Sequence, residues 1–102
     1  MSFDIDALMK MQTQMQQIQE EASKETAEAS AGGGMVTVVA TAGGEIKELR
    51  IDPKAIDPND PEMLADLVMA ATNEALRSAQ AKVEAKMKSM LPPDLGGLLP
   101  GL

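Results

Sequence analysis

Hydrophobic and polar positions follow a helical period over the first quarter of the chain. Apolar side chains are separated by alternating steps of three and four residues, which is the heptad spacing of a helix with one narrow apolar seam. These positions are Leu8, Met11, Met15, Ile18 and Ala22. Ser2 or Asp4 can cap the amino end, so the pattern predicts a helix over residues 2–24. Such a helix either packs against its own sheet or forms an arm that packs on a partner helix.

A period of two replaces the helical period in the middle of the chain. Residues 35–41 form a predicted strand in which Val36 and Val38 share one face. The Ala-Gly-Gly sequence at 42–44 predicts a hairpin turn, and residues 45–51 form the predicted return strand. Together these segments predict a small antiparallel sheet.

The alternation of the return strand contains one interruption. Ile46 is out of phase with Leu49 and Ile51. One extra residue near Lys47 and Glu48 would restore the phase, so we expect a β-bulge there. Because a bulge adds a residue to one strand only, the partner strand should keep its regular alternation.

The longest helical pattern begins at Asp60, a predicted N-cap, with Pro61 at the first helical position. No Gly or Pro interrupts it before about Met90. A straight helix of this length measures about 43 Å, whereas a compact domain of about 100 residues has a radius of gyration of ~13 Å. We therefore expect the helix to bend, break or project.

The chain is predicted to form one domain over residues 1–90, followed by a flexible tail rich in Pro, Gly and Leu at 91–102.

Large apolar side chains are scarce. Leu, Ile, Val and Phe together number 21 of 102 residues, and five of the Leu lie in the last twelve. The hydrophobic fraction of 44% depends instead on Ala and Met. A small domain of this composition builds a thin core, which a second copy of the chain can complete, so we expect an oligomer.

Residues 25–31, ETAEASA, are so small and polar that by themselves they predict a loop.

Catalytic and metal-binding chemistry has little support in the sequence. The chain contains no Cys and no His, which removes thiolate nucleophiles, the commonest proton-transfer side chain and the usual zinc ligand. The glycine triplet at 32–34 lacks the Lys-Ser/Thr of a phosphate-binding loop. The acidic stretch at 52–62 lacks the glycine and terminal glutamate of a calcium loop. We expect no enzymatic activity, no cofactor, no metal and no small-molecule substrate.

Charge is unevenly distributed along the chain. The formal net charge of −7 repels polyanions, but residues 77–90 contain four cations and one acid. The cations are Arg77, Lys82, Lys86 and Lys88. On composition alone this segment is ordinary solvated helix surface, and a phosphate-binding surface is the alternative. Phe3 is the single aromatic residue, so base stacking is nearly excluded, and any DNA contact would be made to the duplex backbone and would weaken with salt.

Five segments, in order along nearly the whole chain, resemble a known family. They are KMQTQMQQIQEE, SAGGGMVTV, RIDPKAI, DPEMLADLVMAATNEALRSAQ and MLPPDLGG. The family is the YbaB/EbfC family of bacterial nucleoid-associated proteins. The most specific blocks are the Ile-Asp-Pro turn at 51–53 and residues 62–75.

The resemblance implies an α+β fold in the order α-β-β-β-α, with residues 25–31 as a first strand. It also implies a homodimer in which the sheets pair at the centre and the helices project as arms around double-stranded DNA. The dimer interface is expected at Val36, Val38, Leu49, Ile51, Leu64 and Leu67. Most phosphate contacts are expected from Arg77, Lys82, Lys86 and Lys88, with Lys10 and Lys24 helping.

A second class of function stays open from the sequence. The acidic surface, the methionine seam and the leucine-rich tail also suit an adaptor that binds a DNA repair or replication protein. No signal-peptide pattern opens the chain, and no apolar run approaches the ~20 residues of a membrane span. We therefore expect a cytoplasmic protein, located at the nucleoid if it binds DNA, with no membrane contact.

Overall fold

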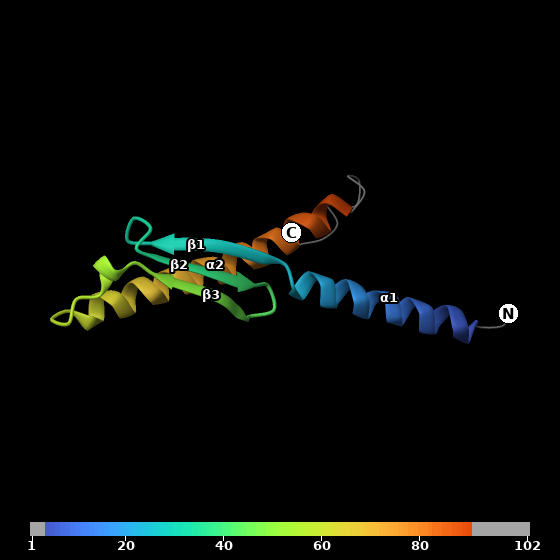
Figure 1. The fold of residues 1–102 in the computed structure, drawn as a ribbon. Coiled ribbons are helices and arrows are strands. Elements are labelled where there is room, and N and C mark those ends of the chain that lie inside the picture. The colour runs from blue at the N-terminus through green and yellow to red at the C-terminus, as the bar shows by residue number, and fades with distance from the viewer. Residues whose placement is uncertain (1–3, 91–102) are drawn as a thin grey trace.

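The computed structural model describes residues 4–90 and contains two long helices and one three-stranded sheet (Figure 1). In chain order the elements are α1 (Ile5–Ser23), β1 (Thr26–Ala31), β2 (Val36–Thr41), β3 (Ile46–Ile51), a short 3-10 turn (Pro53–Ala55) and α2 (Pro61–Met90). This order confirms the expected α+β fold. The predicted tail at 91–102 lies outside the described residues.

The sheet is antiparallel throughout, with strand order β1-β2-β3. Val38 on the central strand lies between Ala29 of β1 and Leu49 of β3. The register of β2 and β3 shifts after the pair of Val39 and Glu48, because the next residue of β2 pairs with Ile46. Lys47 is therefore the extra residue, and the predicted bulge is confirmed.

β1 forms where composition alone predicted a loop, so that prediction was wrong and the strand implied by the family resemblance is confirmed. Its residues Ala27, Ala29 and Ala31 pair with Ala40, Val38 and Val36 of β2. Cross-strand partners point to the same side of a sheet, and this side faces α2. Alanine has a weak preference for strands, so packing under the helix, rather than local propensity, selects the extended conformation.

α2 covers β1 and β2 through a row of alanines. Ala71, Ala75 and Ala79 are fully buried and spaced four residues apart, so they lie on one face of the helix. Small side chains on both surfaces let the helix approach the sheet closely, and Val36 and Val38 fill the space between them. The helix begins as predicted, since the Oδ1 atom of Asp60 accepts a hydrogen bond from the backbone N–H of Met63 at 3.2 Å.

Both helices extend beyond the sheet, and the described chain measures 73 × 29 × 16 Å. In Figure 1, α1 points away from the sheet, and the carboxyl-terminal part of α2 leaves the sheet in a different direction at the same end. α1 begins after its cap Asp4 and contains no buried residue. Of the two interpretations of its apolar seam, packing against its own sheet is therefore excluded.

Candidate nucleic-acid interface

The base of α1 is fixed by the turn between β2 and β3. The backbone N–H of Ala42 donates to the carbonyl of Glu25 at 2.9 Å, and that of Gly43 donates to the carbonyl of Ser23 at 3.0 Å. A Cβ atom added at Gly43 would lie 3.1 Å from both the Cβ and the carbonyl oxygen of Ser23, so glycine permits this close approach. The direction of α1 is thus set by backbone contacts at its carboxyl end.

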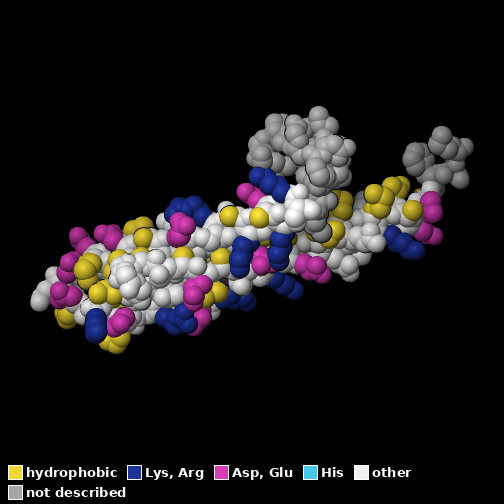
Figure 2. Space-filling view, turned by 90° about the horizontal axis from the view of Figure 1, so that it is seen from above, with side chains coloured by type: hydrophobic (Ala, Val, Ile, Leu, Met, Phe, Trp, Pro, Cys, Tyr) yellow, Lys and Arg dark blue, Asp and Glu magenta, His cyan; other side chains and the backbone are white. Residues whose placement is uncertain are grey.

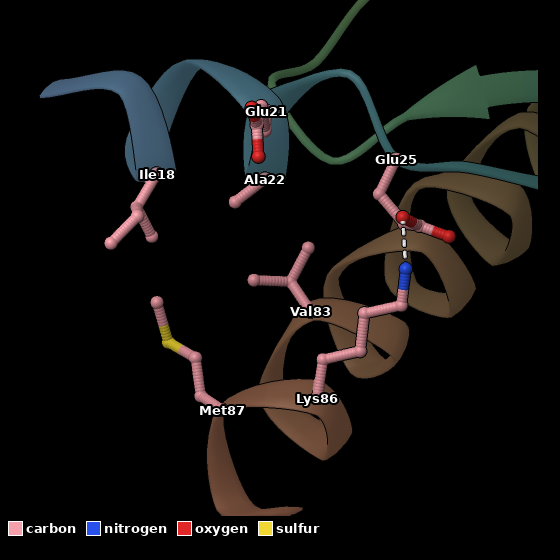
Figure 3. A pocket seen from close by; sticks show the side chains of 7 residues that line it. All are labelled: Ile18, Glu21, Ala22, Glu25, Val83, Lys86 and Met87. Atoms are coloured by element: carbon pink, nitrogen blue, oxygen red, sulfur yellow. Dashed lines mark hydrogen bonds and ion pairs between the residues drawn. The ribbon is translucent and has the colours of Figure 1, made fainter. Parts of the chain in front are cut away.

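A cleft of about 320 Å³ lies between the base of α1 and the distal part of α2. Its lining residues are Ile18, Glu21, Ala22, Glu25, Val83, Lys86 and Met87. Figure 3 shows the apolar side chains of α1 and α2 directed toward each other across this interhelical cleft, with Glu25 and Lys86 at one side. The cleft places acidic residues from the base of α1 next to cations of α2.

Lys82 and Lys86 of α2 meet Glu25 at this cleft. The Nζ atom of Lys86 lies 2.6 Å from the Oε2 atom of Glu25, and the Nζ atom of Lys82 lies 4.0 Å from its Oε1 atom. Lys82 also donates a hydrogen bond to the backbone carbonyl of Thr26 at 2.7 Å. The hydrogen bond from Lys86 is the largest influence on the Glu25 carboxyl and lowers its pKa below the ordinary value. Desolvation opposes this shift, and the weaker effects of the charges on Lys86 and Lys82 lower the pKa as well.

The other predicted cations are exposed and, within residues 4–90, make no ion pair with Glu25. Arg77 pairs within α2, with its Nη2 atom 2.8 Å from the Oε2 atom of Glu74. Lys10 borders a shallow groove on α1 far from the sheet, and Lys24 caps the end of that helix. Among residues 4–90, no carboxylate lies within 4.0 Å of the amines of Lys10, Lys24 or Lys88.

The six predicted cations therefore do not form one continuous basic surface. On the face shown in Figure 2, basic and acidic side chains alternate along the body of the molecule. The structure brings together Lys82 and Lys86 and leaves the remaining four dispersed along the two helices. Sequence analysis missed Glu25, which is 57 and 61 residues from the two lysines that it contacts; its local sequence carries no signal of that contact.

The residues predicted for the dimer interface fall into three environments. Val36 and Val38 are fully buried beneath α2 of the same chain, so their side chains support the sheet from inside the protomer. Leu64, Leu67 and Ile51 are partly buried against this core. Leu49 is 48% exposed on the same side of the sheet as the core.

Within the described residues, no three or more of the side chains that commonly bind metals are grouped so as to hold an ion. No helix in that part of the chain is both long and apolar enough to cross a membrane.

Comparison with known proteins gives matches over most of the chain. Residues 3–95 match the model of the YbaB/EbfC DNA-binding family. A protein of Acetivibrio thermocellus named "Nucleoid-associated protein" is 55% identical over 93 residues, which cover 91% of this chain and 80% of that relative. One of the same name from Saccharopolyspora erythraea is 43% identical over 104 residues, covering 96% of this chain and 90% of that relative.

The fold is also similar to a solved structure. The crystal structure of the uncharacterized protein HP0035 from Helicobacter pylori matches with a TM-score of 0.66 and 26% sequence identity. The match covers 90% of this chain and 99% of that one. The arrangement of a small sheet with two projecting helices is thus shared with a distant relative.

Proposed function

This chain belongs to the YbaB/EbfC DNA-binding family, and from that premise we propose that it binds double-stranded DNA at the bacterial nucleoid as a homodimer. In this proposal the protein contacts mainly backbone phosphates, shows little sequence specificity and performs no chemical step on DNA. The comparisons favour this function over the alternative of an adaptor for a repair or replication protein.

Uncovered apolar side chains on β3 support the proposed homodimer. α2 packs on β1 and β2, so Ile46 and Leu49 of β3 stay 42% and 48% exposed on the side of the sheet that faces the helix. The outer edge of β3 also has no neighbouring strand among residues 4–90. An open edge next to uncovered apolar side chains is a common site of strand pairing or packing by a second chain.

The apolar seam of α1 supports the same proposal. Its four large side chains, from Leu8 to Ile18, are between 48% and 60% exposed. In proteins most of the stability of a helix comes from packing of its apolar face, and α1 buries no residue in the single chain. A second copy of the chain would cover this seam and stabilise the arm.

Exposed cations on the distal half of α2 are the single observation on which phosphate binding rests. Lys86 and Lys88 stand near the carboxyl end of α2, which extends past the sheet, whereas Lys82 lies beside Thr26 of β1 and Arg77 lies over the sheet, between the buried Ala75 and Ala79. All four residues are exposed, so a duplex can approach them. A dimer would present eight such cations. Reading of base edges is not required, because amines and guanidinium groups bind phosphates of any sequence.

Titration of a duplex over a salt series tests this mode of binding. If about six to eight phosphates are neutralised, the logarithm of affinity should fall with the logarithm of salt concentration at a slope near −5 to −7. Replacing Lys82, Lys86 and Lys88 with Gln should reduce the slope and weaken binding while leaving the dimer intact. An affinity that does not change with salt would exclude phosphate binding as the main interaction.

A further inference from the structure

The backbone of Glu25 is held by hydrogen bonds on both sides. The backbone N–H of Glu25 donates to the carbonyl of Ala22 at 3.1 Å, and the backbone carbonyl of Glu25 accepts from the N–H of Ala42 at 2.9 Å. The side chain is only 24% exposed, between the base of α1 and the distal part of α2. Because the residue is anchored on both sides, its carboxylate stays near α2 rather than moving freely in solvent.

The two lysines that reach this carboxylate are themselves accessible. The side chains of Lys82 and Lys86 are 54% and 67% exposed, so an anion in solution can approach their amines. Lys82 has a second acceptor in the carbonyl of Thr26. Within residues 4–90, Glu25 is the one acceptor recorded for the amine of Lys86. Lys86 is therefore the cation whose environment depends most on Glu25.

This ion-pair cluster of Glu25, Lys82 and Lys86 reduces the charge available to DNA. Two cations share one carboxylate, so the cluster presents a net charge of +1, whereas the two lysines alone would present +2. A glutamate carboxylate is ionised at neutral pH even at its ordinary pKa, and the hydrogen bond from Lys86 lowers the pKa of Glu25 further. An ionised carboxylate and a phosphate oxygen both accept charge-assisted hydrogen bonds from an ammonium group, so they compete for it.

We propose that Glu25 sets the affinity of α2 for DNA, because its carboxylate occupies the amine of Lys86 until a backbone phosphate displaces it. This inference rests on the proposed function and adds a residue that weakens binding. The exchange replaces one exposed ion pair with another, so its free-energy change is small and the exchange is reversible. Because of Glu25, α2 releases DNA more readily than the number of its cations alone would predict.

The first test compares Glu25→Gln with Glu21→Gln in duplex titrations at about 50 mM salt. Both variants remove one negative charge from the interhelical cleft, but Glu21 has no recorded ion pair with a lysine among the described residues. Since exposed ion pairs are individually weak and a dimer would contain two clusters, Glu25→Gln should bind about three- to tenfold more tightly than Glu21→Gln. Equal affinities of the two variants would overturn the proposal.

The second test measures the cluster without DNA, by the rate at which an amine-reactive ester labels each lysine. Lys86 should react more slowly than Lys88 in the wild type, and Glu25→Gln should remove this difference while Glu21→Gln keeps it. Labelling of Lys86 that is unaffected by Glu25→Gln would overturn the cluster itself. If labelling responds as expected but neither the wild type nor any variant binds the duplex, the proposed function fails, and DNA is not the competitor.

Discussion

Single glycines decide where this chain can turn. Gly32, Gly33 and Gly34 all have positive φ angles, between 65° and 92°. Other residues pay about 1–2 kcal/mol for this conformation, so the triplet is a backbone requirement of the turn between β1 and β2. The difference in surroundings between one glycine and the next is visible only in the structure.

Gly32 and Gly33 provide a matched pair for this conformational cost. A Cβ atom at Gly32 would lie 2.9 Å from the Cδ2 atom of Leu67, whereas at Gly33 nothing lies within 4 Å. Gly33→Ala should therefore lower the free energy of unfolding by about 1 kcal/mol, and Gly32→Ala by about 1–2 kcal/mol. Urea denaturation at fixed protein concentration measures both values. A smaller loss for Gly32→Ala than for Gly33→Ala would contradict the packing of Leu67 described above.

Glu25 offers a test of charge pairing at the residue scale. Its pKa is lowered chiefly by the hydrogen bond from Lys86, so Lys86→Met should move the pKa back up toward its ordinary value. A carboxyl whose pKa is lower in the folded state stabilises the fold above its unfolded-state pKa, and this contribution is lost as pH falls through the folded-state value. NMR titration of the Glu25 side-chain carboxyl measures the shift. An unchanged pKa in Lys86→Met would mean that the ion pair is not populated in solution.

Helices and strands differ in how much of them the sequence reveals. The start of α2 was predictable because Asp60 and Pro61 are local signals, and the bulge at Lys47 was predictable because one residue breaks a regular alternation. β1 was not predictable from its own composition, because its alanines form a strand by packing under the alanines of α2, which lie at least 40 residues later in the chain. Contacts between distant segments also explain why Glu25 was missed.

The close approach of α2 to the sheet predicts a strong position dependence for larger side chains. Ala75 is fully buried in the core, whereas Ala81 is exposed on the same helix. Ala75→Leu should lower the free energy of unfolding by about 1–3 kcal/mol because the added methyl groups have no space. Ala81→Leu, the control, should change it by less than about 0.5 kcal/mol. Chemical denaturation checks both, and equal stabilities would contradict alanine-mediated packing.

At the scale of the whole molecule, much apolar surface is exposed on an elongated protomer. The side chains of α1 and of β3 face solvent in a single chain, and Figure 2 shows hydrophobic side chains along the projecting α1. Monomeric proteins rarely expose large contiguous apolar surfaces such as a continuous seam along a helix. A thin core of alanine and valine together with open apolar surfaces is the reason to expect that the folded unit is a dimer.

Two lysine substitutions on opposite faces of β3 test which face the proposed dimer would use. Leu49→Lys places a charge on the side with uncovered apolar residues, and Glu48→Lys places one on the opposite, polar side. Leu49→Lys should weaken the dimer at least tenfold, since a buried unpaired charge is costly, and Glu48→Lys should leave it unchanged. Sedimentation velocity over a dilution series measures both. Dissociation caused by Glu48→Lys alone would place the interface on the other face.

The most direct test of the whole account is the mass of the protein in dilute solution by light scattering, with and without a duplex of about 20 base pairs. The protomer has a mass of 10.8 kDa. The account predicts a particle of twice that mass without DNA, and one dimer bound to one duplex when DNA is added at low salt. A folded particle of 10.8 kDa that neither pairs nor changes mass with the duplex would contradict it.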